Sequence, residues 1–123
     1  DEAVSYGKQR ITFGKPILKN QALQFKIADM EIRTETARQM VAHALKLMDE
    51  GKPYSKESAI AKCYAGDVAV QNALEAIQIL GGYGYSREYP VEKLLRDAKI
   101  FQIYEGTNEI QRVVIAKNVI GKF

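Results

Sequence analysis

One segment, Ile103–Arg112, carries the side chains best suited to chemistry, in the order IYEGTNEIQR. Its carboxylate, Glu105, stands directly before Gly106, and glycine lets another molecule approach the backbone because it has no Cβ. Backbone N–H groups at the start of a following helix carry partial positive charge, which suits a carbonyl oxygen or an anion. A carboxylate beside such donors can remove a proton next to a carbonyl group. The segment therefore indicates a general base, with a purely local charge at a helix start as the alternative.

The residues after Gly106 predict where that helix begins. Thr107 or Asn108 can act as its N-cap, and Asn108 with Gln111 has the spacing of a capping box. Apolar residues then continue at helical spacing, which predicts the last helix of the chain: Ile110, Val113, Val114 and Ile120.

Helical periodicity dominates the rest of the chain, and strand-like alternation persists nowhere. Residues 1–10 predict a helix that the chain enters partway. Beyond Gln21, residues step by three and four positions, which predicts a seam that faces another helix: Leu23, Ile27, Met30, Thr34, Ala37, Val41, Ala44 and Met48. Gly51 followed by Pro53 is typical of a helix end.

A second long helix is predicted from Ser55, with Glu57 in its favourable first turn. Its seam repeats the stepping, and small early members allow close helix approach: Ala59, Cys63, Gly66, Val70, Ala73, Ile77 and Leu80. Cys63 therefore has a place in the core and is not a predicted nucleophile. A short third helix follows Pro90, which suits a first turn, and its apolar residues are Val91, Leu94, Leu95 and Ala98.

Together these elements predict an all-α fold, an up-and-down bundle of about four helices plus the entering segment. Three loops connect them and hold most of the site-like residues: 12–20, 81–89 and 101–108. Arg96 and Asp97 suggest a structural ion pair. Tyr83, Tyr85 and Tyr89 suggest an aromatic packing cluster.

Composition excludes several function classes. The chain has 123 residues, enough for one domain with a core, and a formal net charge of +3 without any basic run, so no nucleic-acid or polybasic membrane surface is predicted. One cysteine excludes an internal disulfide, and one histidine excludes an ordinary zinc site. No apolar stretch approaches transmembrane length. The first residue, Asp1, suggests a fragment cut from a longer chain.

Three ordered motifs resemble those of the acyl-CoA dehydrogenase family. Arg96–Ile100 followed by Ile103–Arg112 is similar to the family's C-terminal signature. RITFGKPI, at Arg10–Ile17, resembles its R-x-x-F-G-x-P-I segment. QILGGYGY, at Gln78–Tyr85, with EYPVE at 88–92, resembles its Q-x-x-G-G-x-G-y…y-P-v-E segment. The resemblance covers nearly the whole chain.

The resemblance implies a binding site for FAD and a place for each motif residue. In that family, the residues matching Arg10, Phe13 and Gln21 contact the cofactor, with the arginine suited to its diphosphate. Two further sets are implied to line flavin, the first belonging to a partner subunit's cofactor: Gln78, Ile79, Leu80, Gly81 and Gly82, and then Thr107, Asn108 and Glu109. Glu105 is implied to be the catalytic base, with Tyr104 and Gly106 next to the substrate. No metal is implied.

The resemblance also implies an activity. Enzymes of this family oxidise an acyl-CoA thioester to the trans-2-enoyl-CoA in fatty acid β-oxidation or a related pathway, and here Glu105 would remove the α-proton while FAD takes the β-hydride. Residues 1–123 would form the C-terminal helical domain, which we expect to be inactive without the N-terminal helical and middle β domains.

The implied partners are acyl-CoA, an electron-transferring flavoprotein and further copies in a tetramer. The implied compartment is the cytoplasm of a bacterium or archaeon, or the mitochondrial matrix of a eukaryote. Two alternatives stay open: an acyl-CoA oxidase of the same fold, and a non-enzymatic helical assembly module.

Overall fold

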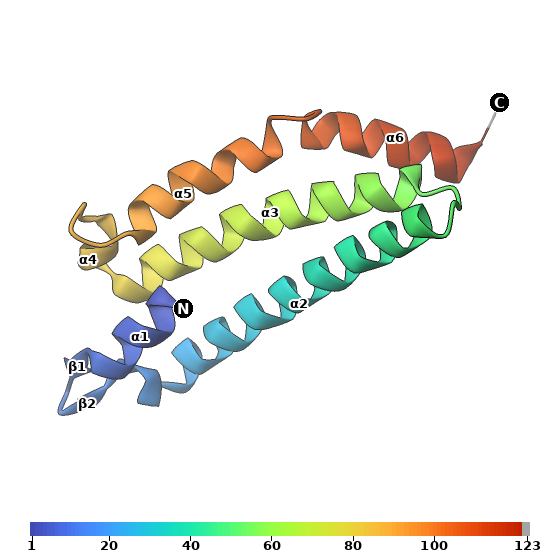
Figure 1. Ribbon diagram of the computed structural model, residues 1–123. Helices are drawn as coiled ribbons and strands as arrows, with labels where there is room; N and C mark the ends of the chain where they lie inside the picture. Colours follow the sequence, from blue (N-terminus) through green and yellow to red (C-terminus); the bar gives the residue numbers. More distant parts are fainter. Residues whose placement is uncertain (122–123) are drawn as a thin grey trace.

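Helices form most of the chain in the computed structural model, which describes residues 1–121 (Figure 1). Among these residues, six α-helices, two 3₁₀ helices and one small hairpin follow in this order: α1 Glu2–Gln9, β1 Ile11–Thr12, β2 Lys15–Pro16, η1 Ile17–Lys19, α2 Gln21–Asp49, α3 Ser55–Leu80, α4 Gly82–Tyr85, α5 Val91–Lys99, η2 Ile100–Gln102 and α6 Asn108–Ile120. The all-α prediction is confirmed. None of the described helices is long and apolar enough to cross a membrane.

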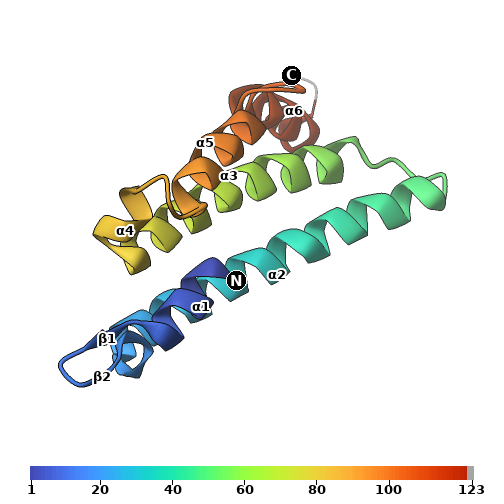
Figure 2. The same ribbon diagram turned by 60° about the vertical axis from the view of Figure 1, so that its left-hand side comes forward.

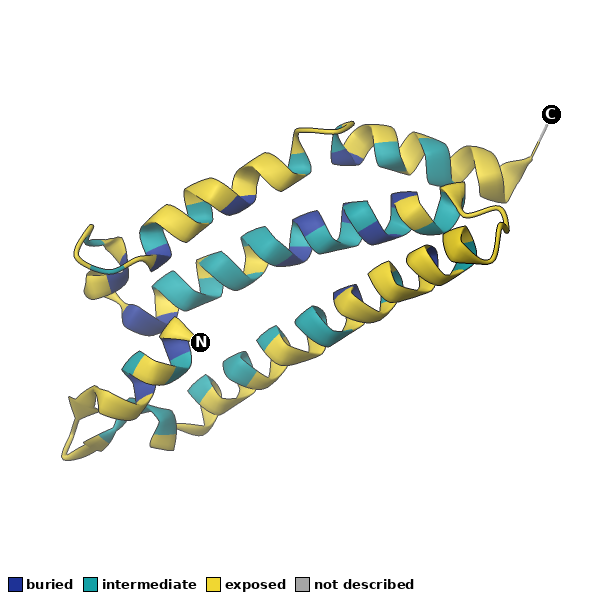
Figure 3. Cartoon of the chain, viewed as in Figure 1, coloured by how far each residue is buried: buried dark blue, intermediate teal, exposed yellow. Residues whose placement is uncertain are grey.

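Helix α3 lies in the middle of the domain, and every other α-helix contacts it. Helix α2 runs antiparallel along one side of α3, whereas α5 and α6 follow one another along the other side (Figures 1 and 2). The predicted up-and-down order is confirmed, with α5 and α6 together taking one position of the bundle. Figure 3 shows that α3, covered on both sides, carries more buried and half-buried positions than α2 or α6.

The seam predicted for α3 serves two neighbours, because small residues on it face η2 and α6 rather than α2. The Sγ atom of Cys63 lies 3.8 Å from the carbonyl oxygen of Asn108. A Cβ added to Gly66 would lie 3.1 Å from the carbonyl oxygen of Phe101. The placement of Cys63 in the core is confirmed. Spacing alone could not separate the two faces, since a helix covered on both sides has apolar residues on each.

Polar side chains make part of the contact between α2 and α3. The Nε atom of Arg33 donates to Oδ1 of Asn72 at 2.9 Å. The amide nitrogen of Asn72 donates back to the carbonyl oxygen of Met30 at 3.1 Å and to the Thr34 hydroxyl at 3.0 Å. Asn72 therefore joins three residues of α2 and fixes the register of the two long helices.

The seam predicted for α2 is buried in part. Leu23, Ile27 and Met30 pack against the core, and Ala37 and Ala44 are buried. Val41 and Met48 stay exposed, at 40% and 45%. Helix α3 is the main neighbour of this half of α2, so large side chains at the edge of the seam keep much of their surface open.

The hydrophobic core lies where α1, α3 and α5 meet. Ala3, Ile79, Leu80 and Val91 form its buried cluster, and half-buried residues of α1, α2 and the loops surround it. Burying each large apolar side chain there contributes about 1.5–3 kcal/mol to folding.

The aromatic cluster differs from the prediction in one member. Tyr6, Tyr83 and Tyr89 pack together with ring centroids 5.5–6.2 Å apart, whereas Tyr85 is 86% exposed. Residues 82–85 form the one-turn helix α4, in which positions two apart point to nearly opposite sides. Tyr83 and Tyr85 therefore cannot join the same cluster, and Tyr6 of α1 takes the third place.

Most predicted helix ends are confirmed, but the loops contain more structure than expected. Helix α3 begins at Ser55, and Gly51 after α2 has a φ of +65°. The loop at 12–20 contains the antiparallel pairing of Ile11 with Pro16. Two residues per strand are too few for an alternating pattern, so periodicity could not reveal it.

The ion pair suggested for Arg96 and Asp97 is wrong. Asp97 pairs instead with Lys93, one turn earlier in α5. Neighbouring residues of a helix point about 100° apart, whereas residues four apart lie on the same face.

Gly84 tests whether α4 must dock closely on the end of α3. A Cβ at Gly84 would lie 2.5 Å from the carbonyl oxygen of Ile77, whereas one at Gly82 in the same turn would meet nothing within 4 Å. We expect Gly84→Ala to lower the free energy of unfolding by about 1–3 kcal/mol, as overpacking does. Gly82→Ala, the matched control, should leave it within about 1 kcal/mol of the unmodified value. Urea unfolding of both variants measures this, and equal stability would contradict the close docking.

Candidate active site

The turn that holds Glu105 has an unusual backbone. Glu105 has a φ of +53° and Gly106 one of +84°, so two successive residues adopt left-handed conformations. For glutamate this conformation is uncommon and costs on the order of 1–3 kcal/mol, which surrounding contacts must offset. The turn joins η2 to α6 and carries an exposed Glu105 side chain.

Of the two residues predicted as the N-cap of helix α6, Thr107 and Asn108, the structure shows Thr107. Thr107 is the N-cap, and its hydroxyl oxygen accepts a hydrogen bond from the backbone N–H of Ile110 at 3.3 Å. The capping box predicted for Asn108 and Gln111 is wrong, because Asn108 is already inside the first turn. The Gln111 side chain instead donates to the carbonyl oxygens of Glu105 and Gly106, at 3.3 and 3.2 Å.

Asn108 is the one buried polar residue of the described chain, with 2% of its surface exposed. Its amide nitrogen donates to the carbonyl oxygen of Cys63 at 3.0 Å and to Oδ1 of Asp67 at 2.8 Å. Its amide oxygen accepts from Nζ of Lys62 at 3.0 Å. All polar atoms of this side chain are thus engaged with α3, and the contact with flavin predicted for Asn108 stays a prediction.

Asp67 accepts hydrogen bonds from three neighbouring side chains. Its carboxylate accepts from Gln102 at 2.7 Å, from Asn108, and from Nη2 of Arg112 at 3.0 Å. Partial burial by itself raises the pKa of Asp67, but these hydrogen bonds outweigh it, so the pKa lies below its ordinary value of 3.8. Asp67 is therefore ionised at neutral pH and supports the contact of η2 and α6 with α3.

Glu109, in the first turn of α6, has a lowered pKa as well. Hydrogen bonds from its own backbone N–H and from the Thr107 side chain stabilise the carboxylate. The negative charge also lies at the positive end of the helix, where it is favourable. Its predicted contact with flavin stays a prediction.

An open cavity lies beside Glu105. It has a volume of about 870 Å³, within the range of about 300–1,000 Å³ that is typical of small-molecule sites. Glu105, Lys62 and Gln111 line one part of it, and the loop between α2 and α3 lines the other. Glu105 is thus a carboxylate at the wall of a ligand-sized space, next to a capped helix start. Such a group can accept a proton from a molecule bound in that space.

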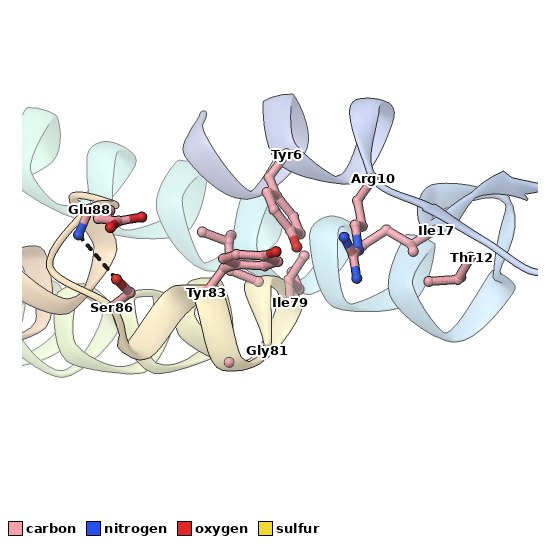
Figure 4. Close-up of a pocket in the computed structure, with 11 residues that line it drawn as sticks. Tyr6, Arg10, Thr12, Ile17, Ile79, Gly81, Tyr83, Ser86 and Glu88 are labelled. Carbon is pink, nitrogen blue, oxygen red and sulfur yellow. Dashed lines mark hydrogen bonds between the residues drawn. The ribbon is translucent and has the colours of Figure 1, made fainter.

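A second cavity contains many of the remaining predicted residues and shares none with the first. It lies between α1, the hairpin and the end of α3, and Arg10, Ile79, Leu80, Gly81 and Gly82 line it (Figure 4). Ile79 and Leu80 are buried in the core, whereas both glycines are exposed. A Cβ at Gly81 or Gly82 would meet nothing within 4 Å, so their backbone is open to another molecule.

Aromatic rings and a cation face each other in this second cavity. The guanidinium carbon of Arg10 lies 5.4 Å from the ring centroid of Tyr83, a cation–π distance. Figure 4 shows Tyr6 and Tyr83 side by side, with Arg10 beside them. Tyr6, Ser86 and Glu88 also line the cavity, and sequence reasoning missed them as lining residues.

The other predicted cofactor residues lie on the outer surface of the chain. Phe13 stands at the hairpin turn with a φ of +50° and a fully exposed side chain. Gln21 begins α2 and Gln78 lies on the last turn of α3, and both are exposed. This exposure leaves the Phe13 ring accessible to another molecule or another copy. Their cofactor roles stay predictions.

Sequence reasoning also missed Lys62 and Asp67. Both lie on α3 next to seam positions. They were missed because only the apolar and small residues of α3 were considered as contacts. The available signal was two charged residues flanking the small residues Cys63 and Gly66 in a predicted core helix. Within the described chain, no group of three His, Cys, Asp or Glu side chains is arranged to hold a metal ion.

Comparison with known proteins gives consistent matches. The family model described as "Acyl-CoA dehydrogenase, C-terminal domain" matches residues 1–120. An acyl-CoA dehydrogenase of Bacillus subtilis (strain 168) is 56% identical over 121 residues, which are 98% of this chain and 32% of that protein. This chain thus spans about a third of the length of that curated relative.

Solved structures share the fold closely. A chain from a structure of the electron transferring flavoprotein of Acidaminococcus fermentans has a TM-score of 0.96 and 51% identity, over 98% of this chain and 32% of that one. Butyryl-CoA dehydrogenase from Megasphaera elsdenii has a TM-score of 0.95 and 53% identity, over 97% and 31%. An FAD complex of PigA has a TM-score of 0.91 and 33% identity, over 95% and 30%.

The contacts of Asp67 predict a pH-dependent stability. A carboxyl whose folded pKa is lowered stabilises the fold above its unfolded pKa of about 3.8, and the stabilisation is lost as the pH falls through the folded value. Asp67→Asn should therefore lower the free energy of unfolding at pH 7, and its difference from the unmodified chain should shrink below pH 4. Urea unfolding between pH 7 and 3 measures both.

Asp29→Asn is the matched control, because Asp29 is an exposed carboxyl in the middle of α2. Its effect on the free energy of unfolding should be small at every pH. A difference for Asp67→Asn that stays constant down to pH 3 would contradict an ionised, hydrogen-bonded Asp67.

Proposed function

Because this chain belongs to the acyl-CoA dehydrogenase family, we propose that it is the C-terminal domain of an enzyme that oxidises an acyl-CoA thioester to the trans-2-enoyl-CoA. The observation that carries the proposal is the position of Glu105. Glu105 lines an open cavity of small-molecule size and lies two residues before Thr107, the N-cap of α6. The relative named butyryl-CoA dehydrogenase supports the same class of substrate.

In the proposed reaction Glu105 accepts the α-proton of the thioester. The electron pair left behind forms the new double bond as the β-hydrogen departs with its own pair. FAD would supply the acceptor for that hydride. Developing negative charge on the thioester oxygen needs hydrogen-bond donors, and the backbone N–H of Glu105 is the donor that the resemblance implies. Gly106 next to it has no side chain to obstruct the thioester.

The second cavity fits one part of the proposed cofactor site. Gly81 and Gly82 leave their backbone open, and Arg10 offers a guanidinium that can bind a diphosphate with two parallel hydrogen bonds. Phe13, Gln21 and Gln78 are exposed at the hairpin turn, at the start of α2 and on the last turn of α3, and can contact the cofactor from this chain. Thr107, Asn108 and Glu109 lie at the start of α6, close to Glu105 in the chain and away from the second cavity, so we propose that one chain serves two cofactors, its own and that of a neighbouring copy.

The proposed partners follow from this arrangement. A homotetramer would let each copy complete the site of another. The exposed Phe13, Phe25 and Ile32 offer apolar surface for such contacts or for the other domains. We propose an electron-transferring flavoprotein as the electron acceptor, in keeping with the structure of Acidaminococcus fermentans. The chain alone should be inactive, because the remaining two thirds of the relatives' length are needed.

Glu105→Gln in the full-length enzyme tests the base. Glutamine has nearly the same shape but cannot accept the α-proton, so the variant should fold, retain FAD and bind acyl-CoA. Its rate of flavin reduction should fall about 10²–10⁴-fold, the usual effect of losing a positioned base. Glu105→Asp should keep partial activity because the carboxylate survives.

Anaerobic stopped-flow absorbance on mixing with acyl-CoA measures the rate of reduction. An unchanged rate for Glu105→Gln would mean that the base lies elsewhere. Reoxidation of the reduced enzyme by oxygen as fast as turnover would favour an acyl-CoA oxidase instead.

Arg10→Ala in the full-length enzyme tests the second cavity. Loss of a charge-assisted hydrogen bond of about 1.5–3 kcal/mol should weaken FAD binding roughly 10- to 150-fold. Lys8→Ala, which removes an exposed charge from the last turn of α1, two residues before Arg10, is the matched control and should retain FAD. Retained flavin after dialysis measures both variants.

Mixed oligomers of Arg10→Ala and Glu105→Gln copies then test which chain serves which site. If one active site loses both functions only when the two substitutions lie on different copies, then each active site is built from two copies. Sites built wholly from one chain would contradict the proposed sharing.

A further inference from the structure

The conformation of Glu105 requires a restraint that Glu105 itself does not supply. Its φ of +53° and that of Gly106, +84°, place the turn in a region that glutamate visits at a cost. The Glu105 side chain is exposed and the turn lies at the edge of an open cavity. Hydrogen bonds to the backbone carbonyl groups of the turn can hold its backbone, and with it the direction in which the Glu105 side chain leaves the chain.

Three hydrogen bonds to those carbonyl groups are present. Gln111 donates to the carbonyl oxygens of Glu105 and Gly106, but at 3.3 and 3.2 Å these bonds are long. The ammonium group of Lys62 donates to the carbonyl oxygen of Gly106 at 2.7 Å, and it comes from another helix. A charged donor at this distance makes the strongest of the three contacts.

Lys62 is itself held in place from the opposite side. Its ammonium group also donates to the amide oxygen of Asn108 at 3.0 Å, and Asn108 is buried with both of its N–H donors engaged. No carboxylate partner competes for Lys62 among the ion pairs of the described chain. The ammonium group thus joins the turn to the most constrained side chain of α6.

We propose that Lys62 is a positioning residue, which fixes the Glu105–Gly106 turn through the Gly106 carbonyl and so aims the Glu105 carboxylate at the substrate. The proposal rests on the proposed function, because it assumes that Glu105 is the base. A merely structural role would hold α3 against α6. The aliphatic stem and the contacts of Asn108 with Cys63 and Asp67 can do that without the ammonium group.

Loss of the ammonium group should act on proton transfer and leave binding intact. A base displaced by about 1 Å can lose up to 10²-fold in rate, although all groups remain present. The experiment uses full-length enzyme containing FAD and a 3-thia-acyl-CoA, in which sulfur replaces C3. This analogue has acidic α-hydrogens but no β-hydrogen to release. Exchange of its α-hydrogens with D₂O, followed by NMR, therefore reports the base separately from hydride transfer.

Lys62→Met keeps the length of the apolar stem and removes the donor. We expect the exchange rate at saturating analogue to fall about tenfold to a hundredfold, with the Kd of the analogue and the FAD content unchanged. Lys93→Met removes an exposed, ion-paired ammonium group from α5 and is the matched control, expected to exchange at the unmodified rate. Should Lys62→Met lose its FAD, Lys62→Leu, whose side chain also lacks a hydrogen-bond donor, is measured instead.

The outcomes separate the two proposals. An unchanged saturated exchange rate in the Lys62 variant, or a loss that arises only from weaker analogue binding, overturns the role of Lys62 while the role of Glu105 stands. Glu105→Gln is measured in the same assay, and exchange that survives in it overturns the base and with it the need to position one. Both proposals are supported if Glu105→Gln loses exchange, and if the exchange rate falls in Lys62→Met but not in Lys93→Met.

Discussion

The hydrogen bonds of Asn108 determine how the C-terminal part of the domain rests on α3. Its side chain is buried, and a buried amide without partners would cost about 1–3 kcal/mol for each unpaired group. Both donors and the acceptor are satisfied by residues of a single stretch of α3, which leaves α6 one position in which to begin. The Thr107 cap and the left-handed turn of Glu105 and Gly106 lie directly before that position. Gly66 contributes by letting η2 approach α3 closely enough for these bonds to form.

The cavity beside Glu105 and the cavity beside Arg10 are lined by different chemical groups. One has a carboxylate and an ammonium group at its wall, which suits proton transfer at a bound substrate. The other has open glycine backbone, tyrosine rings and a guanidinium group, which suits the recognition of a large planar and anionic ligand. Neither is enclosed by this chain alone. The exposed Phe13 beside the second cavity is consistent with a chain whose surfaces are completed by other domains and copies.

Sequence reasoning located the helices and the acidic residue of the candidate site, but not the contacts that hold it. Periodicity predicted α3 correctly because its apolar positions recur locally, within a few residues of each other. It could not assign Cys63 and Gly66 to η2 and α6, since spacing shows a face and not the neighbour that covers it. The bond between Lys62 and Gly106 joins residues far apart in the chain and depends on the whole fold. The cap was predicted as one of two options because Thr107 and Asn108 are both good cap residues, and burial of Asn108 decided between them.

The position of α3 between two cavities has a consequence for how such a chain can vary in length. Lys62 and Leu80 are separated by about five helical turns, so they lie on the same side of α3, roughly 27 Å apart. Inserting a single residue between them would rotate one end by about 100° against the other, which would direct either Lys62 away from Gly106 or Leu80 away from the core. The number of residues between Lys62 and Leu80 is therefore fixed by the contacts at the two ends of α3. Relatives that gain or lose residues should do so in the loops at its ends, and the helix itself should keep its count.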